Sequence, residues 1–165
     1  MAIRKRTRAR ELALQHLYTV DLRGADDSEN LAAWLETQTN DARIRAFAAD
    51  IATGCMEHTA AIDAEIKRVA KNWDFHRIAV VDRNILRLAV YEMLHRGDIP
   101  PRVTLNEAIE LAKRFSTAES GGFVNALLDK IRANHGLDPD KARAPAQGAV
   151  EPDGEIDDVA HAADD

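Results

Sequence analysis

The chain has 165 residues, a net charge of −6 and 45% hydrophobic residues, which suits a single domain with a substantial core. No apolar run approaches the roughly 18 residues of a membrane span, and charged Arg10-Glu11 stands where a signal peptide would continue into an apolar run. The single cysteine, Cys55, cannot form a disulfide within the chain, which fits a reducing compartment. We therefore expect a cytoplasmic protein with no membrane partner.

Charge is distributed unevenly along the chain. Residues 1–24 carry six cations against two carboxylates, a net charge of +4, whereas residues 137–165 carry nine carboxylates against two cations, a net charge of −7. A basic start of this kind can bind nucleic-acid phosphates, can be a solvated helix start, or can pair with an acidic segment. Composition alone leaves these alternatives open.

Apolar residues at helical spacing predict a first helix over residues 5–22, which Gly24 ends. Its buried face is predicted to hold Ala9, Leu12, Ala13, His16, Leu17 and Val20. The opposite face is predicted to hold Arg4, Arg8, Glu11, Gln15 and Tyr18, with Arg10 and Leu14 at the edge. The first helix is therefore predicted to be amphipathic, with a basic exposed side.

The middle of the chain is predicted to be helical as well. Ser28 can cap a short second helix, and Asp41 can cap a long third helix that continues to Val69. Gly54 lies inside that helix, where another helix can pack closely. Residues 72–74 are predicted to break the chain before a helix over residues 79–94. That helix is apolar on nearly all faces, which is typical of the centre of a bundle, and Gly97 ends it.

Two further helices follow Pro100-Pro101. Thr104 and Glu107 fit a capping box at the start of one helix, and Ser116 and Glu119 fit a second box at the start of the other, which Gly136 ends. With no strand alternation and no repeat, the predicted fold class is all-α, with six or seven helices in one domain over residues 1–136. Residues 137–165 are predicted to be a disordered acidic tail, which either solubilises the protein or competes weakly with RNA for the basic helix.

The sequence gives little support for catalysis or metal binding. Cys55 and His58 are the only pair at ligand spacing, whereas a structural zinc site needs four ligands. Ser120 lacks the G-x-S-x-G surroundings of a nucleophile elbow, and the chain has no G-x-x-x-x-G-K phosphate loop. Four acidic residues on apolar helices are explained by caps or salt bridges more readily than by acid–base catalysis: Asp82, Glu92, Glu107 and Glu110. We expect no enzyme, no metal and no cofactor.

The basic segment is the strongest candidate for function. Its cations can bind phosphates, whereas Gln15 and Tyr18 on the same helix can contact an unpaired base, with the tyrosine ring stacking on it. Cations in the first turn of a helix oppose its macrodipole at a few tenths of a kcal/mol each, a cost that is easier to understand if they bind an anion. The candidate phosphate-binding residues are Arg4, Lys5, Arg6, Arg8 and Arg10.

Four segments, in chain order, carry a resemblance to a known family: RTRARELALQHLY, DRNILRLAVYEML, LNEAIELAKRF and FVNALLDKI. They resemble the NusB family of bacterial transcription antitermination factors, over about residues 4–134. The resemblance implies two small helical bundles packed together and a binding activity without catalysis. It implies as partners the single-stranded boxA element of ribosomal RNA transcripts, the small-subunit ribosomal protein NusE, and the RNA polymerase antitermination complex. It leaves open whether the free protein is a monomer or a homodimer.

The resemblance also assigns residues by position. The arginine-rich helix that meets RNA in the family corresponds to Arg6, Arg8, Arg10 and Tyr18. The junction of the last two helices, which extends the RNA surface, corresponds to Phe115, Glu119, Ser120 and Phe123. Asp82 matches an acidic position facing NusE, although an internal ion pair, for example with the neighbours of Arg83 or with Lys113, would also explain it. The chain departs from the family at Ser116 and Ala126, where glycine is usual, and near Gly122, where a lysine is usual. The missing lysine removes a cation from the RNA side, and the alanine is expected to need more room at a helix contact.

Two alternative functions remain open. A NusB-like domain also precedes some ribosomal RNA cytosine methyltransferases, but no glycine-rich strand-turn-helix segment is present here. A helical adaptor that binds an acidic protein through its basic helix would have a similar composition. Titration with single-stranded RNA would separate the adaptor from an RNA-binding factor.

Overall fold

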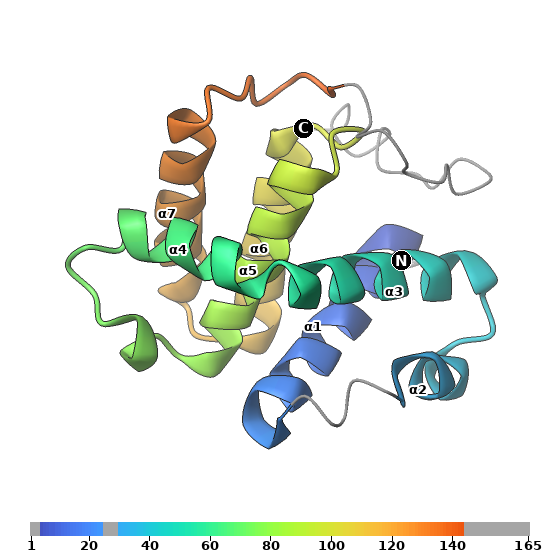
Figure 1. Cartoon of the computed structure of the whole chain (residues 1–165). Coiled ribbons are helices and arrows are strands. Elements are labelled where there is room, and N and C mark those ends of the chain that lie inside the picture. The colour runs from blue at the N-terminus through green and yellow to red at the C-terminus, as the bar shows by residue number, and fades with distance from the viewer. Residues whose placement is uncertain (1–3, 25–29, 144–165) are drawn as a thin grey trace.

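A computed structural model of the chain describes residues 4–24 and 30–143. These residues form seven α-helices and a short 3₁₀ helix, with no strand among them, so the predicted all-α class is confirmed (Figure 1). The elements are α1 (Lys5–Arg23), α2 (Leu31–Gln38), α3 (Ala42–Glu57), α4 (Thr59–Val69), η2 (Phe75–Arg77), α5 (Val80–His95), α6 (Pro101–Phe115) and α7 (Ser120–Asn134). Within the described part of the chain, no helix is both long and apolar enough to cross a membrane.

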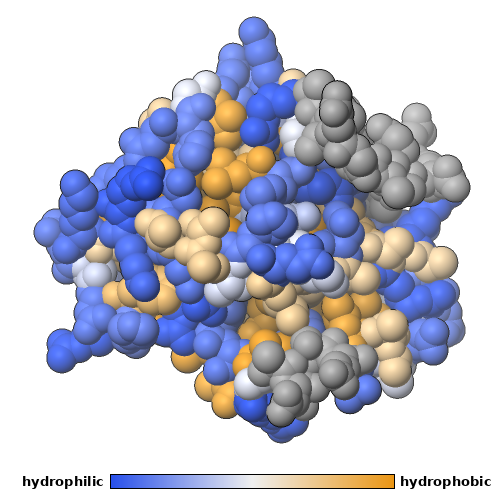
Figure 2. Space-filling model, in the orientation of Figure 1, coloured by the Kyte–Doolittle hydropathy of each residue, from blue (hydrophilic) through white to orange (hydrophobic). Residues whose placement is uncertain are grey.

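Helix α5 lies at the centre of the molecule, as predicted. It packs against α1 and α3 on one side and against α4, α6 and α7 on the other, which joins two helical groups into one body (Figure 1). Its buried residues cover nearly all of its faces and include the polar Asn84 and Glu92. On the face of the molecule shown in Figure 2, most of the surface is hydrophilic and apolar side chains appear in separate patches.

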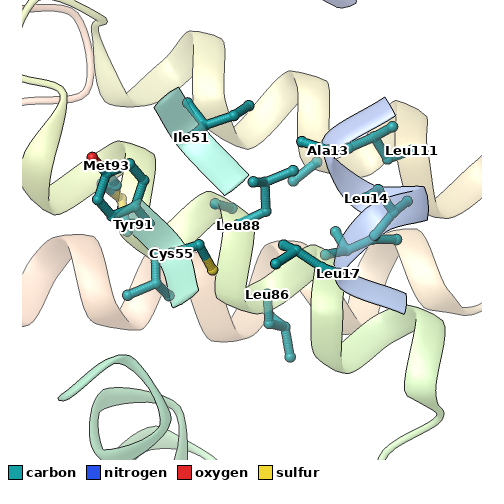
Figure 3. Packing of buried hydrophobic residues seen from close by; sticks show 14 of the residues in the cluster. Ala13, Leu14, Leu17, Ile51, Cys55, Leu86, Leu88, Tyr91, Met93 and Leu111 are labelled. Carbon is teal, nitrogen blue, oxygen red and sulfur yellow. The ribbon is translucent and has the colours of Figure 1, made fainter. Parts of the chain in front are cut away.

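The crossing of α3 and α5 depends on Gly54. A Cβ atom built on Gly54 would lie 2.1 Å from Cζ of Tyr91, so the tyrosine ring occupies the space that any side chain would need. Tyr91 and Cys55 both face this part of the core in Figure 3. The short distance to Tyr91 confirms the predicted close approach of another helix at Gly54. Burial in the same part of the core raises the pKa of the Cys55 thiol to about 12.

The third helix differs from its prediction at one end. Asp41 caps α3 as expected, because its Oδ1 accepts hydrogen bonds from the backbone N–H groups of Arg43 and Ile44 at 2.9 and 3.4 Å. However, the helix ends at Glu57, and a separate helix, α4, begins at Thr59. At this break the Thr59 hydroxyl donates to the backbone oxygens of the preceding turn, an alternative to the helical ladder that threonine readily offers. The prediction of one helix reaching Val69 is wrong, and Ser28 lies outside the described residues.

Both predicted capping boxes are wrong. Helix α6 begins with Pro101 at its first position, so Thr104 and Glu107 lie inside the helix, and their side chains bind Glu92 and Thr7 instead. Ser116 ends α6, and α7 begins only at Ser120. The Thr104 and Glu107 side chains bind tertiary partners instead of capping the helix, and the Ser116 hydroxyl lies 2.9 Å from the Ser120 hydroxyl.

The first part of the predicted acidic tail contacts the helices. Leu137 packs against the core, Pro139 accepts a hydrogen bond from the Arg102 backbone N–H, and Asp140 pairs with the Arg102 side chain. Arg143 donates its backbone N–H to Gly97 between α5 and α6, so this segment crosses from α7 to that turn (Figure 1). Residues 144–165 lie outside the described residues, and the disorder of the tail there stays a prediction.

Candidate nucleic-acid interface

The basic residues of α1 lie on different sides of the helix. Lys5 is at the surface, with Nζ 2.8 Å from Oδ2 of Asp41. Arg8 is partly exposed, whereas Arg6 and Arg10, one helical turn apart, point into the molecule. Arg4 is partly buried at the start of the helix. The basic run is therefore not one continuous cationic surface.

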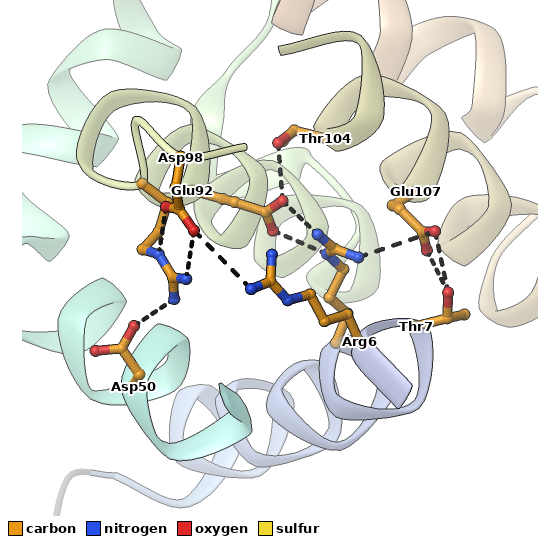
Figure 4. Close-up of polar contacts among 9 residues, drawn as sticks. Arg6, Thr7, Asp50, Glu92, Asp98, Thr104 and Glu107 are labelled. Carbon is orange, nitrogen blue, oxygen red and sulfur yellow. Dashed lines mark hydrogen bonds and ion pairs between the residues drawn. The ribbon is translucent and has the colours of Figure 1, made fainter. Parts of the chain in front are cut away.

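Arg10 belongs to a buried polar network with Glu92 and Glu107, two of the residues labelled in Figure 4. It is 1% exposed, and its guanidinium donates two hydrogen bonds to the Glu92 carboxylate at 2.9 and 2.7 Å. Glu92 also accepts from the Thr104 hydroxyl at 2.8 Å, and the Glu107 carboxylate lies 3.9 Å from Arg10. A buried guanidinium that is held by two carboxylates cannot reach RNA. The predicted role of Arg10 is therefore corrected to a structural one.

Arg6 is mostly covered by the same network. Its guanidinium lies 4.7 Å from the centre of the Phe47 ring, and one of its nitrogens is 3.9 Å from Oδ2 of Asp98. Arg10 and Arg96 face the same ring at 5.3 and 5.0 Å. Three arginines around one aromatic ring hold α1, α3 and α5 together. Arg6 is therefore a weaker candidate for RNA contact than Arg8.

Arg8 shares a carboxylate with a distant residue. Its Nη1 lies 3.2 Å from Oε2 of Glu11, while Arg114 at the end of α6 binds the other carboxylate oxygen, Oε1. Glu11 is 1% exposed although the helical pattern predicted it to be outward-facing. The helix wheel was misleading here because the end of α6 covers this part of α1.

Three predicted residues meet in one groove. Gln15 and Tyr18 of α1 and Phe115 of α6 line a hollow of about 550 Å³, together with Trp34 and Val81. Tyr18 and Phe115 are each 38% exposed and belong to the few large hydrophobic residues that the described part of the chain leaves exposed. The groove thus presents two aromatic rings and an amide along the seam between α1 and α6, which suits stacking and hydrogen bonding of a base.

Three more of the predicted residues meet in a second hollow of about 420 Å³. Glu119, Ser120 and Phe123 line it together with Trp73, whose ring centre is 5.2 Å from that of Phe123 in an edge-on arrangement. Asp82 also lines this hollow, and the neighbouring Val81 lines the first. The start of α5 therefore separates the two hollows.

Asp82 is 7% exposed and accepts a hydrogen bond from the Ser120 hydroxyl at 3.0 Å. The suggested pair with Lys113 is wrong, since Lys113 lies 3.5 Å from Glu110 instead. An internal contact of Asp82 therefore exists, but its partner is a hydroxyl group on α7.

Sequence reasoning missed Trp73, Glu11 and Arg114 as parts of these surfaces. Arg114 follows Lys113 in the last turn of α6, and this adjacent pair of cations was an available signal. Of the departures from the family, Gly122 has nothing within 4 Å of a built Cβ, so a longer side chain would fit there. Ala126 is exposed, so the expected tightness at a helix contact is wrong.

The fold and the surface together define a class: an all-helical protein whose first helix forms a cationic and aromatic seam with the end of α6, without a group of three or more metal-binding side chains among the described residues. The model of the NusB family matches residues 7–133. The chain belongs to the NusB family.

Individual NusB proteins are similar to this chain in sequence and in structure. The transcription antitermination protein NusB of Desulforapulum autotrophicum is 44% identical over 135 residues, which cover 81% of this chain and 94% of the relative. The structure of T. maritima NusB has a TM-score of 0.70 and 37% identity, covering 87% of this chain and 96% of that one. A crystal structure of the antitermination factors NusB and NusE in complex with double-stranded RNA has a TM-score of 0.72 and 27% identity, covering 81% and 99%.

Proposed function

We propose that this protein is a transcription antitermination factor of the bacterial cytoplasm that binds boxA-type RNA of ribosomal RNA transcripts together with NusE. The observation that carries the proposal is the seam between α1 and α6, where Tyr18, Gln15 and Phe115 line one groove and Arg8 and Arg114 share the Glu11 carboxylate. The name of the D. autotrophicum relative and the related complex of NusB, NusE and RNA support the same function. The antitermination complex of RNA polymerase is the assembly in which this binding acts.

Different side chains of the seam are proposed to contact different parts of the RNA. Arg8, with Arg4 and Lys5 near the start of α1, supplies cations for phosphates, and release of condensed counterions then favours binding. Tyr18 and Phe115 supply aromatic faces for bases, and Gln15 supplies a hydrogen-bonding edge. The second hollow, with Phe123 and Trp73, extends the aromatic surface past the start of α5. This role needs binding without bond-making, so no residue is assigned a catalytic step.

The antitermination role is favoured over a methyltransferase-linked domain. The match to the D. autotrophicum protein spans 94% of that relative, whose name is that of an antitermination protein. The rival adaptor role predicts no RNA affinity. It is therefore tested directly by the titration described below.

The test is a titration of the full chain with a labelled single-stranded boxA-type RNA, with and without NusE, followed by fluorescence anisotropy. A duplex of the same sequence and a scrambled single strand are the controls, because the related complex contains double-stranded RNA. We expect the boxA strand to bind more tightly than the scrambled strand, and more tightly still when NusE is present. Absence of RNA binding under both conditions would favour the helical adaptor.

For the NusE side, we infer that Asp82 contributes through the hollow that it lines with Glu119 and Ser120. Asp82→Lys would place a long cation in a buried position, so Asp82→Asn, of the same size, is the sharper variant. We expect Asp82→Asn to weaken NusE binding by a larger factor than it weakens RNA binding by the isolated protein, because the same hollow also belongs to the proposed RNA surface. A lower melting temperature with normal NusE affinity would assign Asp82 to the internal hydrogen bond with Ser120 alone.

A further inference from the structure

We propose that Glu11, Arg8 and Arg114 form a phosphate clamp, in which the buried Glu11 carboxylate positions two guanidinium groups for one stretch of RNA backbone. The inference rests on the proposed RNA-binding function and deepens it. It adds Arg114 as an RNA contact and Glu11 as a positioning residue. The three residues come from two helices that meet only in the folded chain, α1 and α6.

The geometry of the clamp is set by one carboxylate with two partners. The Glu11 side chain is 2% exposed, whereas those of Arg8 and Arg114 are 32% and 48% exposed. Oε2 of Glu11 accepts from Nη1 of Arg8 at 3.2 Å, and Oε1 accepts from Nη1 of Arg114. The anion is therefore beneath the surface and the cations are at the surface.

The charge balance leaves the clamp able to bind an anion. Two guanidinium groups against one carboxylate have a net positive charge, and each guanidinium has five N–H donors, of which Glu11 occupies only a part. Planar donors of this kind match the oxygens of a phosphate. Holding both groups on a common buried anchor also lowers the entropy lost when they are ordered on RNA. The anchor thus serves binding although its own charge is negative.

The clamp is continuous with the aromatic groove. Gln15 lies one helical turn after Glu11 on α1, and Phe115 directly follows Arg114 on α6. The Arg114 guanidinium is 5.5 Å from the centre of the Phe115 ring, so the same arginine contacts both the buried anchor and the groove wall. A strand whose backbone lies on the clamp therefore has its bases beside Tyr18 and Phe115.

A positioning role and a purely electrostatic role of Glu11 predict opposite changes in RNA affinity for Glu11→Gln. If Glu11 acts on RNA only through its charge, Glu11→Gln removes a repulsive anion and tightens RNA binding. If Glu11 holds the arginines in place, Glu11→Gln releases them and weakens binding. Glu110→Gln is the matched control, because Glu110 is an exposed carboxylate on the same helix as Arg114 and is paired with Lys113 at 3.5 Å.

The experiment measures the affinity of the full chain for single-stranded boxA-type RNA at several potassium chloride concentrations. We expect Arg114→Ala to weaken binding severalfold and to flatten the log–log salt dependence by about 0.7, the contribution of one phosphate contact in a single strand. We expect Glu11→Gln to weaken binding as well, and to have little further effect when Arg8 and Arg114 are both replaced by alanine. Glu110→Gln is expected to leave affinity unchanged or slightly increased.

The outcomes separate this inference from the proposed function. If the unsubstituted chain binds no RNA, the proposed function itself fails. If it binds RNA but Arg114→Ala has the parent affinity and the parent salt slope, the clamp is overturned. A folded Glu11→Gln protein that binds as tightly as the parent, or more tightly, overturns the positioning role. Thermal denaturation shows whether the Glu11→Gln protein folds. If it does not fold, the affinity and salt slope of Arg114→Ala decide whether the clamp binds RNA.

Discussion

Arg8 and Arg10 are two residues apart in the same basic run, yet they lie in opposite environments. Arg10 is 1% exposed and is bound by Glu92, a residue of the central helix. The Arg8 side chain is 32% exposed and is bound by Glu11 at the seam with α6. The difference teaches that a run of arginines does not by itself define a binding surface. The carboxylates on neighbouring helices decide which of its cations remain available.

The inward arginines are paired inside the fold, whereas the outward arginines are the ones that we propose for RNA binding. Burying a guanidinium is tolerable only when its charge and its N–H groups are satisfied, and Glu92 and Glu107 provide this for Arg10. At the seam the anion is buried and the cations are exposed, which is the reverse arrangement.

The largest effect is expected from Arg10→Ala, which leaves the Glu92 carboxylate buried without its cation. Breaking a buried pair in this way costs about 3–5 kcal/mol, so we expect the free energy of unfolding to fall by that amount. Arg8→Ala removes a partly exposed pair and is expected to cost at most about 1 kcal/mol. Urea denaturation of both variants is the measurement, and equal losses would contradict the contrast.

Cys55 provides an independent readout of the same pair of variants. Its thiol is buried and has a pKa raised to about 12 by burial, so alkylation at mildly alkaline pH requires opening of the core. We expect labelling to be accelerated far more by Arg10→Ala than by Arg8→Ala, which should speed it by at most about fivefold.

A smaller loss is expected from Gly54→Ala on the interior side. The added Cβ would lie 2.1 Å from the Tyr91 ring, and overpacking of this kind costs typically about 1–3 kcal/mol. Gly122→Ala in α7 is the control, because nothing lies within 4 Å of its built Cβ and alanine favours a helix by up to about 1 kcal/mol. The melting temperature should therefore fall for Gly54→Ala and rise for Gly122→Ala.

On the outer side, Tyr18→Ala is expected to weaken RNA binding by about 1–3 kcal/mol, the range for loss of one stacked base. Tyr18→Phe should retain most of the affinity, because the ring is preserved. RNA titration combined with melting temperatures checks both variants. Loss of folding in both would place Tyr18 in the core, and parent-like affinity in both would remove stacking from its role.

The smallest expected effect is on the pH dependence of stability, through Asp21 near the C-terminal end of α1. Burial alone would raise the pKa of Asp21, but hydrogen bonds from Arg83 and Asn84 and the charges of Arg87 and Arg83 hold it below its ordinary value of 3.8. A depressed folded-state pKa contributes stability above the unfolded pKa, which is lost as pH falls through the folded one. Urea denaturation at pH 7 and pH 3 should show a smaller acid-induced loss for Asp21→Asn than for the parent. Equal losses would contradict the role of Asp21.

Much of the fold could be predicted from local pattern. The helical spacing of apolar residues located the central helix, Asp41 marked a cap, and Gly54 marked a close crossing. These features could be predicted because helical spacing, a cap and a glycine are each recognised from residues that are close together in the sequence. The break at His58 was missed, because there the Thr59 hydroxyl bonds back to the preceding turn. The start of α6 was placed wrongly, because Thr104 bonds to Glu92 instead of capping the helix.

The candidate site was less predictable for a related reason. Gln15, Tyr18 and Phe115 were named from sequence, and the structure brings them into one groove. The burial of Arg10 depends on Glu92, 82 residues away, and the pairing of Glu11 with Arg114 spans 103 residues. A helical wheel of α1 contains neither partner. It therefore could not say which charged side chains face inward.

The most direct test of the central claim is NMR of the arginine side-chain Nε–H groups during titration with single-stranded boxA-type RNA. Nε of Arg10 donates to Glu92 at 2.9 Å and Nε of Arg96 donates to Asp98 at 3.0 Å, so both groups are already engaged inside the protein. We predict that RNA shifts the signals of Arg8 and Arg114 and leaves those of Arg10 and Arg96 in place. A shift of the Arg10 signal with unchanged Arg8 and Arg114 signals would contradict the division between inward and outward arginines.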